Sequence, residues 1–194
     1  MNRVRKVAIM LMLLMLSSAM GAPQAWAQFY FGGSFGKSDY ENGNVVPDLI
    51  TSGTVNGDDP GFKVFGGYQA NPYFGLEIAY VDLGKATYSG SFFGQPVTGG
   101  SLGTTGANFS AVGTIPLSPS FSLFGKLGFF VWEQKARDTT NGVPFSGKDD
   151  GQDLSLGVGA SLNLTRNVSL RLEWERFEAG DSIDFLSLGV AFRF

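Results

Sequence analysis

Seven charged residues belong to the polar faces of segments whose other face is apolar: Lys63, Glu77, Lys126, Arg171, Glu173, Glu175 and Arg193. Carboxylates and cations that share an enclosed face can form ion pairs, or a pair of carboxylates can carry out acid–base chemistry. Glu173 and Glu175 are spaced to lie on one face of a strand. Cations lie near both of them, so we interpret these residues as partners in structural ion pairs.

The composition argues against other catalytic chemistry. The sequence contains no His and no Cys, so it lacks the commonest general base, the commonest metal ligand and any thiol. Nucleophilic mechanisms that pair His with Ser or Asp are therefore excluded. Two Asp-containing segments, 56–60 and 148–153, do not have the spacing of a calcium loop and are expected to be solvated turns. We expect no enzymatic activity, no cofactor and no bound metal.

The first 27 residues have the organisation of a secretory signal peptide. A basic start at residues 3–6 precedes an unbroken apolar run at residues 7–16, and Ala25 and Ala27 form an A-x-A cleavage site. The apolar run is shorter than the ~20 residues that a membrane-spanning helix needs. We therefore predict a signal peptide over residues 1–27, cleaved after Ala27.

The remaining residues, 28–194, are expected to form one domain. Cleavage would remove three cations and no acid from a chain whose net charge is −3. The domain is therefore acidic, and it has no basic stripe. This charge pattern argues against nucleic-acid binding.

In the predicted domain, eight segments place a large apolar residue at nearly every second position. Such alternation is typical of β-strands, because successive side chains point to opposite faces. The polar faces are rich in Gly, Ser and Ala, and Gly makes up 28 of 194 residues, about twice the usual ~7%. The predicted strands are 29–37, 61–70, 73–83, 105–115, 121–133, 153–164, 168–175 and 184–194.

The connections distinguish a soluble sandwich from a membrane barrel, which would turn its apolar face to lipid. Bacterial barrels have short turns on the periplasmic side and long loops outside, and small residues suit the narrow lumen of an eight-stranded barrel. We therefore predict an all-β fold, an eight-stranded antiparallel up-and-down transmembrane β-barrel. Short turns at 71–72, 116–119 and 165–167 alternate with long polar segments at 38–60, 84–103 and 134–151.

The last predicted strand ends on an aromatic residue, Phe194. This ending resembles the C-terminal strand of bacterial outer-membrane barrels, which their assembly machinery reads. We expect Leu188, Val190, Phe192 and Phe194 to form this assembly signal on the lipid-facing side.

Three segments resemble the transmembrane domain of the outer-membrane protein A (OmpA) family: GYQANPYFGLE at 67–77, RLEW at 171–174 and LSLGVAFRF at 186–194. The resemblance implies a barrel in the outer membrane of a Gram-negative bacterium, with salt bridges inside it. Glu77 and Arg171 match this interior network directly, and Lys126 matches a family arginine. Ser161 and Val112 stand where the family can carry a carboxylate and a lysine. Because the sequence ends at its eighth strand, we expect a porin-like member that consists of the barrel alone.

We expect a structural and surface-interaction protein whose lumen is plugged by ion pairs among Glu77, Lys126, Arg171 and Glu173. The alternative is a narrow, low-conductance pore for ions or small solutes. The expected partners are outer-membrane lipid and lipopolysaccharide, the barrel assembly machinery, and an extracellular ligand of the long loops. Cations near the outer rim, such as Lys37 and Arg176, could contact lipopolysaccharide phosphates.

Overall fold

The computed structural model describes residues 28–40, 50–56, 59–92, 95–140, 143–179 and 181–194. The predicted signal peptide, with Ala25 and Ala27, lies outside these residues. Within the described ranges, no helix is long and apolar enough to cross a membrane.

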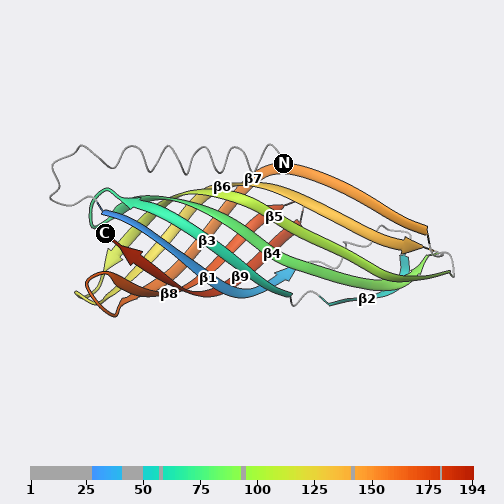
Figure 1. The fold of residues 1–194 in the computed structure, drawn as a ribbon, viewed down its shortest axis with the longest axis horizontal. Coiled ribbons are helices and arrows are strands. Elements are labelled where there is room, and N and C mark those ends of the chain that lie inside the picture. The colour runs from blue at the N-terminus through green and yellow to red at the C-terminus, as the bar shows by residue number, and fades with distance from the viewer. Residues whose placement is uncertain (1–27, 41–49, 57–58, 93–94, 141–142, 180) are drawn as a thin grey trace.

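Nine antiparallel strands are described, and eight of them close into a barrel (Figure 1). Consecutive barrel strands pair with each other, and pairing of β1 with β9 and of β4 with β5 closes the sheet. The additional strand, β2, pairs with the outer part of β4. The predicted eight-stranded up-and-down barrel is therefore confirmed. The strands are β1 (Gln28–Tyr40), β2 (Ile50–Asn56), β3 (Asp59–Gln69), β4 (Phe74–Phe92), β5 (Gln95–Pro116), β6 (Phe121–Thr140), β7 (Val143–Asn163), β8 (Val168–Ala179) and β9 (Asp181–Arg193).

The two faces of the sheet have opposite character, as the alternation predicts. On β7, Leu156 is 52% exposed while its neighbour Ser155 is 3% exposed. On β1, the outward-facing Phe35 is 77% exposed, which is high for a phenylalanine. Such a continuous apolar exterior suits lipid rather than water.

The predicted assembly residues lie on this exterior. Leu188, Phe192 and Phe194 are exposed, and Val190 is partly exposed. The ring of Phe31 stacks on those of Phe192 and Phe194, with centroids 5.4 and 5.5 Å apart. The Phe194 amide donates a hydrogen bond to the carbonyl of Phe29, which ties the last strand to the first. Recognition of these four residues by the assembly machinery stays a prediction.

Large rings in the lumen lie opposite glycines on neighbouring strands. A Cβ built on Gly67 would lie 2.2 Å from the ring of Tyr30, so only glycine leaves room there. This pairing explains part of the glycine excess. The pairs in direct register are Tyr30 with Gly67, Phe65 with Gly32, Phe124 with Gly159, and Trp132 with Gly151.

The prediction of long loops at 84–103 and 134–151 is wrong. Strand pairing continues through nearly all of both segments, and β2 occupies part of the predicted loop 38–60. Residues 178–179 and 181–182 also belong to strands, which pair with each other. These polar, Gly- and Ser-rich stretches lack an apolar alternation, but backbone hydrogen bonds pair them nonetheless.

The outer parts of β4, β5, β6 and β7, together with β2, form one continuous piece of sheet, which we call the sheet extension. It projects beyond the ends of β1, β8 and β9 (Figure 1). It begins at a bulge on β4, where the register shifts between Asp82 and Lys85. Gly84 has a φ of 77° there, a left-handed conformation that favours glycine. Its amide donates a 3.0 Å hydrogen bond to Asp82 Oδ1.

Candidate functional site in the barrel lumen

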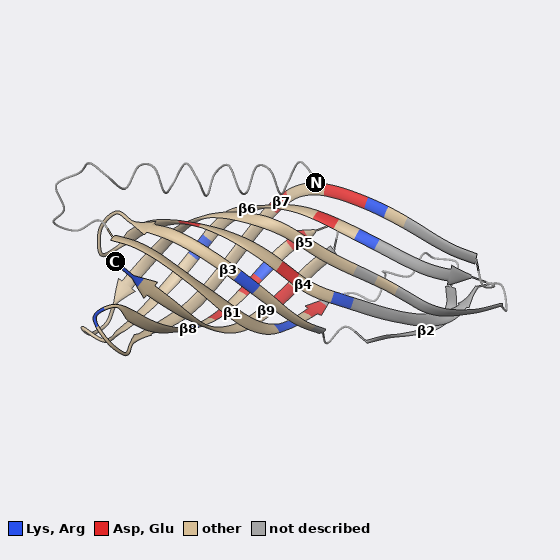
Figure 2. Ribbon diagram, viewed as in Figure 1, with Lys and Arg blue, Asp and Glu red and all other residues tan. Residues whose placement is uncertain are grey.

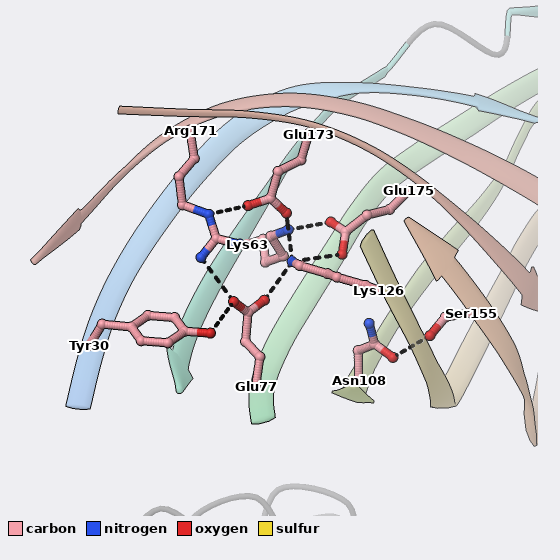
Figure 3. A network of polar contacts seen from close by, with 9 residues as sticks. All are labelled: Tyr30, Lys63, Glu77, Asn108, Lys126, Ser155, Arg171, Glu173 and Glu175. Atoms are coloured by element: carbon pink, nitrogen blue, oxygen red, sulfur yellow. Dashed lines mark hydrogen bonds and ion pairs between the residues drawn. The ribbon is translucent and has the colours of Figure 1, made fainter. Parts of the chain in front are cut away.

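Six charged side chains meet in the middle of the lumen, and we call them the interior network (Figure 3). They come from β3, β4, β6 and β8, and each is at most 6% exposed. Three are cations and three are carboxylates, so their formal charges cancel. The members are Lys63, Glu77, Lys126, Arg171, Glu173 and Glu175.

Lys126 lies among all three carboxylates of the network. Its Nζ is 2.6 Å from Glu77 Oε1, 2.7 Å from Glu173 Oε2 and 3.3 Å from Glu175 Oε1. Its three donor positions are thereby matched by three acceptors. The ammonium is fully paired within the barrel.

Arg171 joins two carboxylates and two aromatic rings. Its Nη1 donates a 2.9 Å hydrogen bond to Glu77 Oε2. Its Nε lies 2.7 Å from Glu173 Oε1, an ion pair without hydrogen-bond geometry. The guanidinium carbon lies 4.6 Å from the centroid of Phe65 and 4.5 Å from that of Phe124, within cation–π range.

Lys63, Glu175 and Tyr30 complete the arrangement. Lys63 Nζ donates to both Glu173 and Glu175, and the hydroxyl of Tyr30 donates a 3.0 Å hydrogen bond to Glu77 Oε2. The alternation placed Lys63 and Glu175 on the lumen face without assigning them to the cluster. Tyr30 was missed, and its place between two outward phenylalanines was the available signal.

An apolar group fills the lumen on the loop side of the interior network, and we call it the outer plug. The rings of Phe130 and Phe177 have centroids 4.6 Å apart. Gln134 Nε2 donates a 2.7 Å hydrogen bond to the carbonyl of Ala179, which ties the outer end of β8 to β6 across the mouth. The fully buried members of the plug are Leu83, Phe130, Phe177, Ala179, Ile183 and Phe185.

On the turn side, a polar cavity of about 610 Å³ leads from the periplasmic mouth to the network. Its lining includes the amide and hydroxyl side chains of Gln28, Gln69 and Ser122, and it reaches Arg171. Arg193, the seventh predicted lumen charge, lines this cavity and does not join the network. The lumen therefore runs from a polar vestibule through a charged layer to an apolar layer.

Charged residues also lie on the outward face near the loop ends of the strands. Arg176 forms a two-pronged ion pair with Asp184, with both N–O distances 2.7 Å, and its guanidinium lies 5.6 Å from the Trp174 ring. Arg176, one of the two cations expected near lipopolysaccharide phosphates, therefore already holds a carboxylate. Among the described residues, no group of three or more His, Cys, Asp or Glu side chains is arranged to hold a metal.

A closed antiparallel barrel with an apolar exterior and a packed lumen defines the class of transmembrane β-barrels. The chain belongs to the family of the OmpA-like transmembrane domain, whose model matches residues 24–194. It is therefore an integral protein of the outer membrane of a Gram-negative bacterium.

Curated relatives share this assignment. The chain is 32% identical to outer membrane protein A of Serratia marcescens over 185 residues, covering 90% of this chain and 48% of the relative. It is 30% identical to outer membrane protein A of Klebsiella pneumoniae, covering 90% and 50%. The chain thus spans about half the length of the curated relatives it matches.

Solved structures show the same fold. The outer membrane protein OprG from Pseudomonas aeruginosa superposes with a TM-score of 0.63 at 11% identity, covering 87% of this chain and 96% of that one. Ail, the attachment invasion locus protein of Yersinia pestis, superposes with a TM-score of 0.57 at 16% identity, covering 89% and 100%. At these identities the likeness concerns the fold alone.

Proposed function

We propose that this protein is a non-conducting outer-membrane barrel with a structural role, which holds its sheet extension at the cell surface for interaction. One observation carries the proposal: the lumen is closed by two successive layers, the interior network and the outer plug. An ion that entered the vestibule would meet a neutral, fully paired cluster and then an apolar layer. Both layers would have to rearrange for steady conduction.

The arrangement of the carboxylates supports a non-enzymatic role. Glu173 and Glu175, whose spacing could suit acid–base work, both contact Lys63 and Lys126. Buried at 1% and 2% exposure, they have no open side for a substrate.

The proposal includes three kinds of partner. The apolar exterior supports contact with outer-membrane lipid, including the acyl chains of lipopolysaccharide. The exposed end of β9 supports recognition by the assembly machinery, and the sheet extension supports contact with an extracellular ligand.

The vestibule favours the alternative, a narrow pore, because this cavity extends from the periplasmic mouth to Arg171 of the network. Conductance in planar bilayers separates the two functions. We expect refolded wild-type protein to pass little or no current. Glu77→Ala leaves Lys126 and Arg171 short of a carboxylate, so it should lower the free energy of unfolding by ~3–5 kcal/mol while the outer plug still blocks steady current.

The double variant Glu77→Ala/Phe177→Ala weakens both layers and is expected to open intermittently. Arg193→Ala is the matched control, because this side chain lies in the vestibule outside the network; it should leave both conductance and melting unchanged. A large, steady wild-type current that neither Glu77→Ala nor the double variant alters would overturn the closed barrel in favour of the pore.

A further inference from the structure

Within the described ranges, no strand pairs with one edge of the outer part of β7. β6 pairs with β7 along its whole length, from Thr140↔Val143 onward. Pairing with β8 begins only at Ser155↔Phe177. Residues 143–154 therefore form the border of the sheet extension, where β7 continues beyond the end of β8 with β6 on its other side (Figure 1).

The direction of the backbone groups on this border follows from two hydrogen bonds. The Asn163 amide donates to Ser120, on the β6 side, and the Leu164 amide donates to Val168, on the β8 side. The register between β6 and β7 has no shift, so odd-numbered amides face β6 and even-numbered amides face the open edge. Lys148 and Gln152 thus present a backbone donor and acceptor outward, whereas the Asp150 amide on the same edge donates a 2.9 Å hydrogen bond to Asp149 Oδ1.

The border is acidic. Asp149 and Asp150 are exposed, and neither has an ion-pair partner among the described residues. They point to opposite faces of the strand. The nearby cation, Lys148, is held 3.0 Å from Glu133 Oε2. The charged stretch on the outer parts of β6 and β7 is seen in Figure 2.

We propose that residues 147–154 of β7 bind an extended, cationic segment of an extracellular partner by β-strand addition. Backbone hydrogen bonds would supply affinity, and Lys or Arg side chains opposite Asp149 and Asp150 would supply selectivity. A second copy of this edge would place like charges together, which disfavours self-pairing. The inference rests on the proposed surface-interaction function.

The test uses the refolded barrel in detergent micelles and a synthetic nine-residue peptide of Thr with two adjacent Lys at its centre, so that one Lys can face each aspartate. Affinity is measured by fluorescence anisotropy of the labelled peptide. Gln152→Pro removes an edge amide without touching the β6 side, where proline is tolerated in an edge strand. Gln152→Ala keeps that amide and is the matched control. Asp149→Asn/Asp150→Asn removes the charge while keeping the backbone.

We expect wild type and Gln152→Ala to bind alike, and Gln152→Pro to bind at least about tenfold more weakly, from a lost hydrogen bond and the ring that blocks approach. The double Asn variant and a peptide with Glu in place of Lys should both bind more weakly. A peptide N-methylated at alternate residues tests the same ladder without changing the protein, and it should not bind.

Equal binding of the N-methylated peptide, or of Gln152→Pro with an unchanged melting curve, would show electrostatic adsorption and overturn the proposal. So would a wild type that does not bind. None of these results affects the conductance measurement. Failure of the β7-edge proposal can therefore be distinguished from failure of the proposed non-conducting barrel.

Discussion

Glu173 is the residue that contacts all three buried cations, Lys63, Lys126 and Arg171. It lies between Arg171 and Glu175 on the inward face of β8, so five consecutive residues of one strand supply half of the interior network. The period of two in this short segment is enough to place its charges together. Their partners arrive from β3, β4 and β6.

At the same scale, the contact of rings with glycines predicts a sharp difference between two substitutions. Gly67→Ala places a methyl group 2.2 Å from the Tyr30 ring, so the ring must move and give up its hydrogen bond to Glu77. Overpacking of this kind typically costs ~1–3 kcal/mol. Urea unfolding in lipid vesicles measures the change.

The control for this substitution is Gly113→Ala, where an added Cβ has nothing within 4 Å. We expect it to change the free energy of unfolding by less than ~0.5 kcal/mol. Equal effects at the two glycines would contradict the packing described for the lumen.

At the scale of elements, the strands are recognisable because each turns one face to lipid and the other to a crowded lumen. This difference predicts opposite results at neighbouring positions of β7. Leu156→Lys puts a charge into lipid and should cost roughly 2–4 kcal/mol near the midplane. A lipid-soluble quencher should reach a fluorophore attached at a cysteine replacing Leu156 or Val158, and largely miss one replacing Ser155. An inverted pattern would mean that the register is off by one residue.

The strand cores and their facing could be predicted because lipid requires an apolar side chain at nearly every outward position. The sheet extension could not, since residues 84–103 and 134–151 lie beyond the apolar pattern and their strands are held by backbone hydrogen bonds. The apolar alternation therefore located the strands only up to the rim.

The interior was predicted unevenly for a related reason. Alternation placed Glu77, Lys126, Arg171 and Glu173 on the lumen face, and the resemblance to the OmpA family implied salt bridges among such charges. In the outer plug, Phe130 and Phe185 stand at inward positions of the predicted strands 121–133 and 184–194. Phe177 lies beyond the predicted strand 168–175, so the alternation did not place it. Contacts between distant strands, such as Tyr30 with Glu77, depend on the closed barrel.

At the scale of the whole molecule, pairing of β1 with β9 joins the ends of the sheet. Phe194 contributes to this seam through its ring, stacked on Phe31, and its amide, bonded to Phe29. We expect deletion of Phe194 to lower the amount of folded barrel in the outer membrane while export continues. Heat-dependent gel mobility of membrane fractions measures the folded amount, and periplasmic levels measure export. A deletion that assembles normally would contradict a role for this residue in assembly.

The charges of the interior network come from strands that are not all neighbours, and this affects the route into the membrane. β6 and β8 are each separated from β3 and β4 by at least one other strand. An open sheet in lipid would leave these cations and carboxylates unpaired, at a cost of several kcal/mol for each ion. Neutrality is reached only when the cylinder is complete. Insertion and curling of the sheet are therefore coupled steps, and a half-inserted intermediate should keep its charged strands in water until the last seam forms.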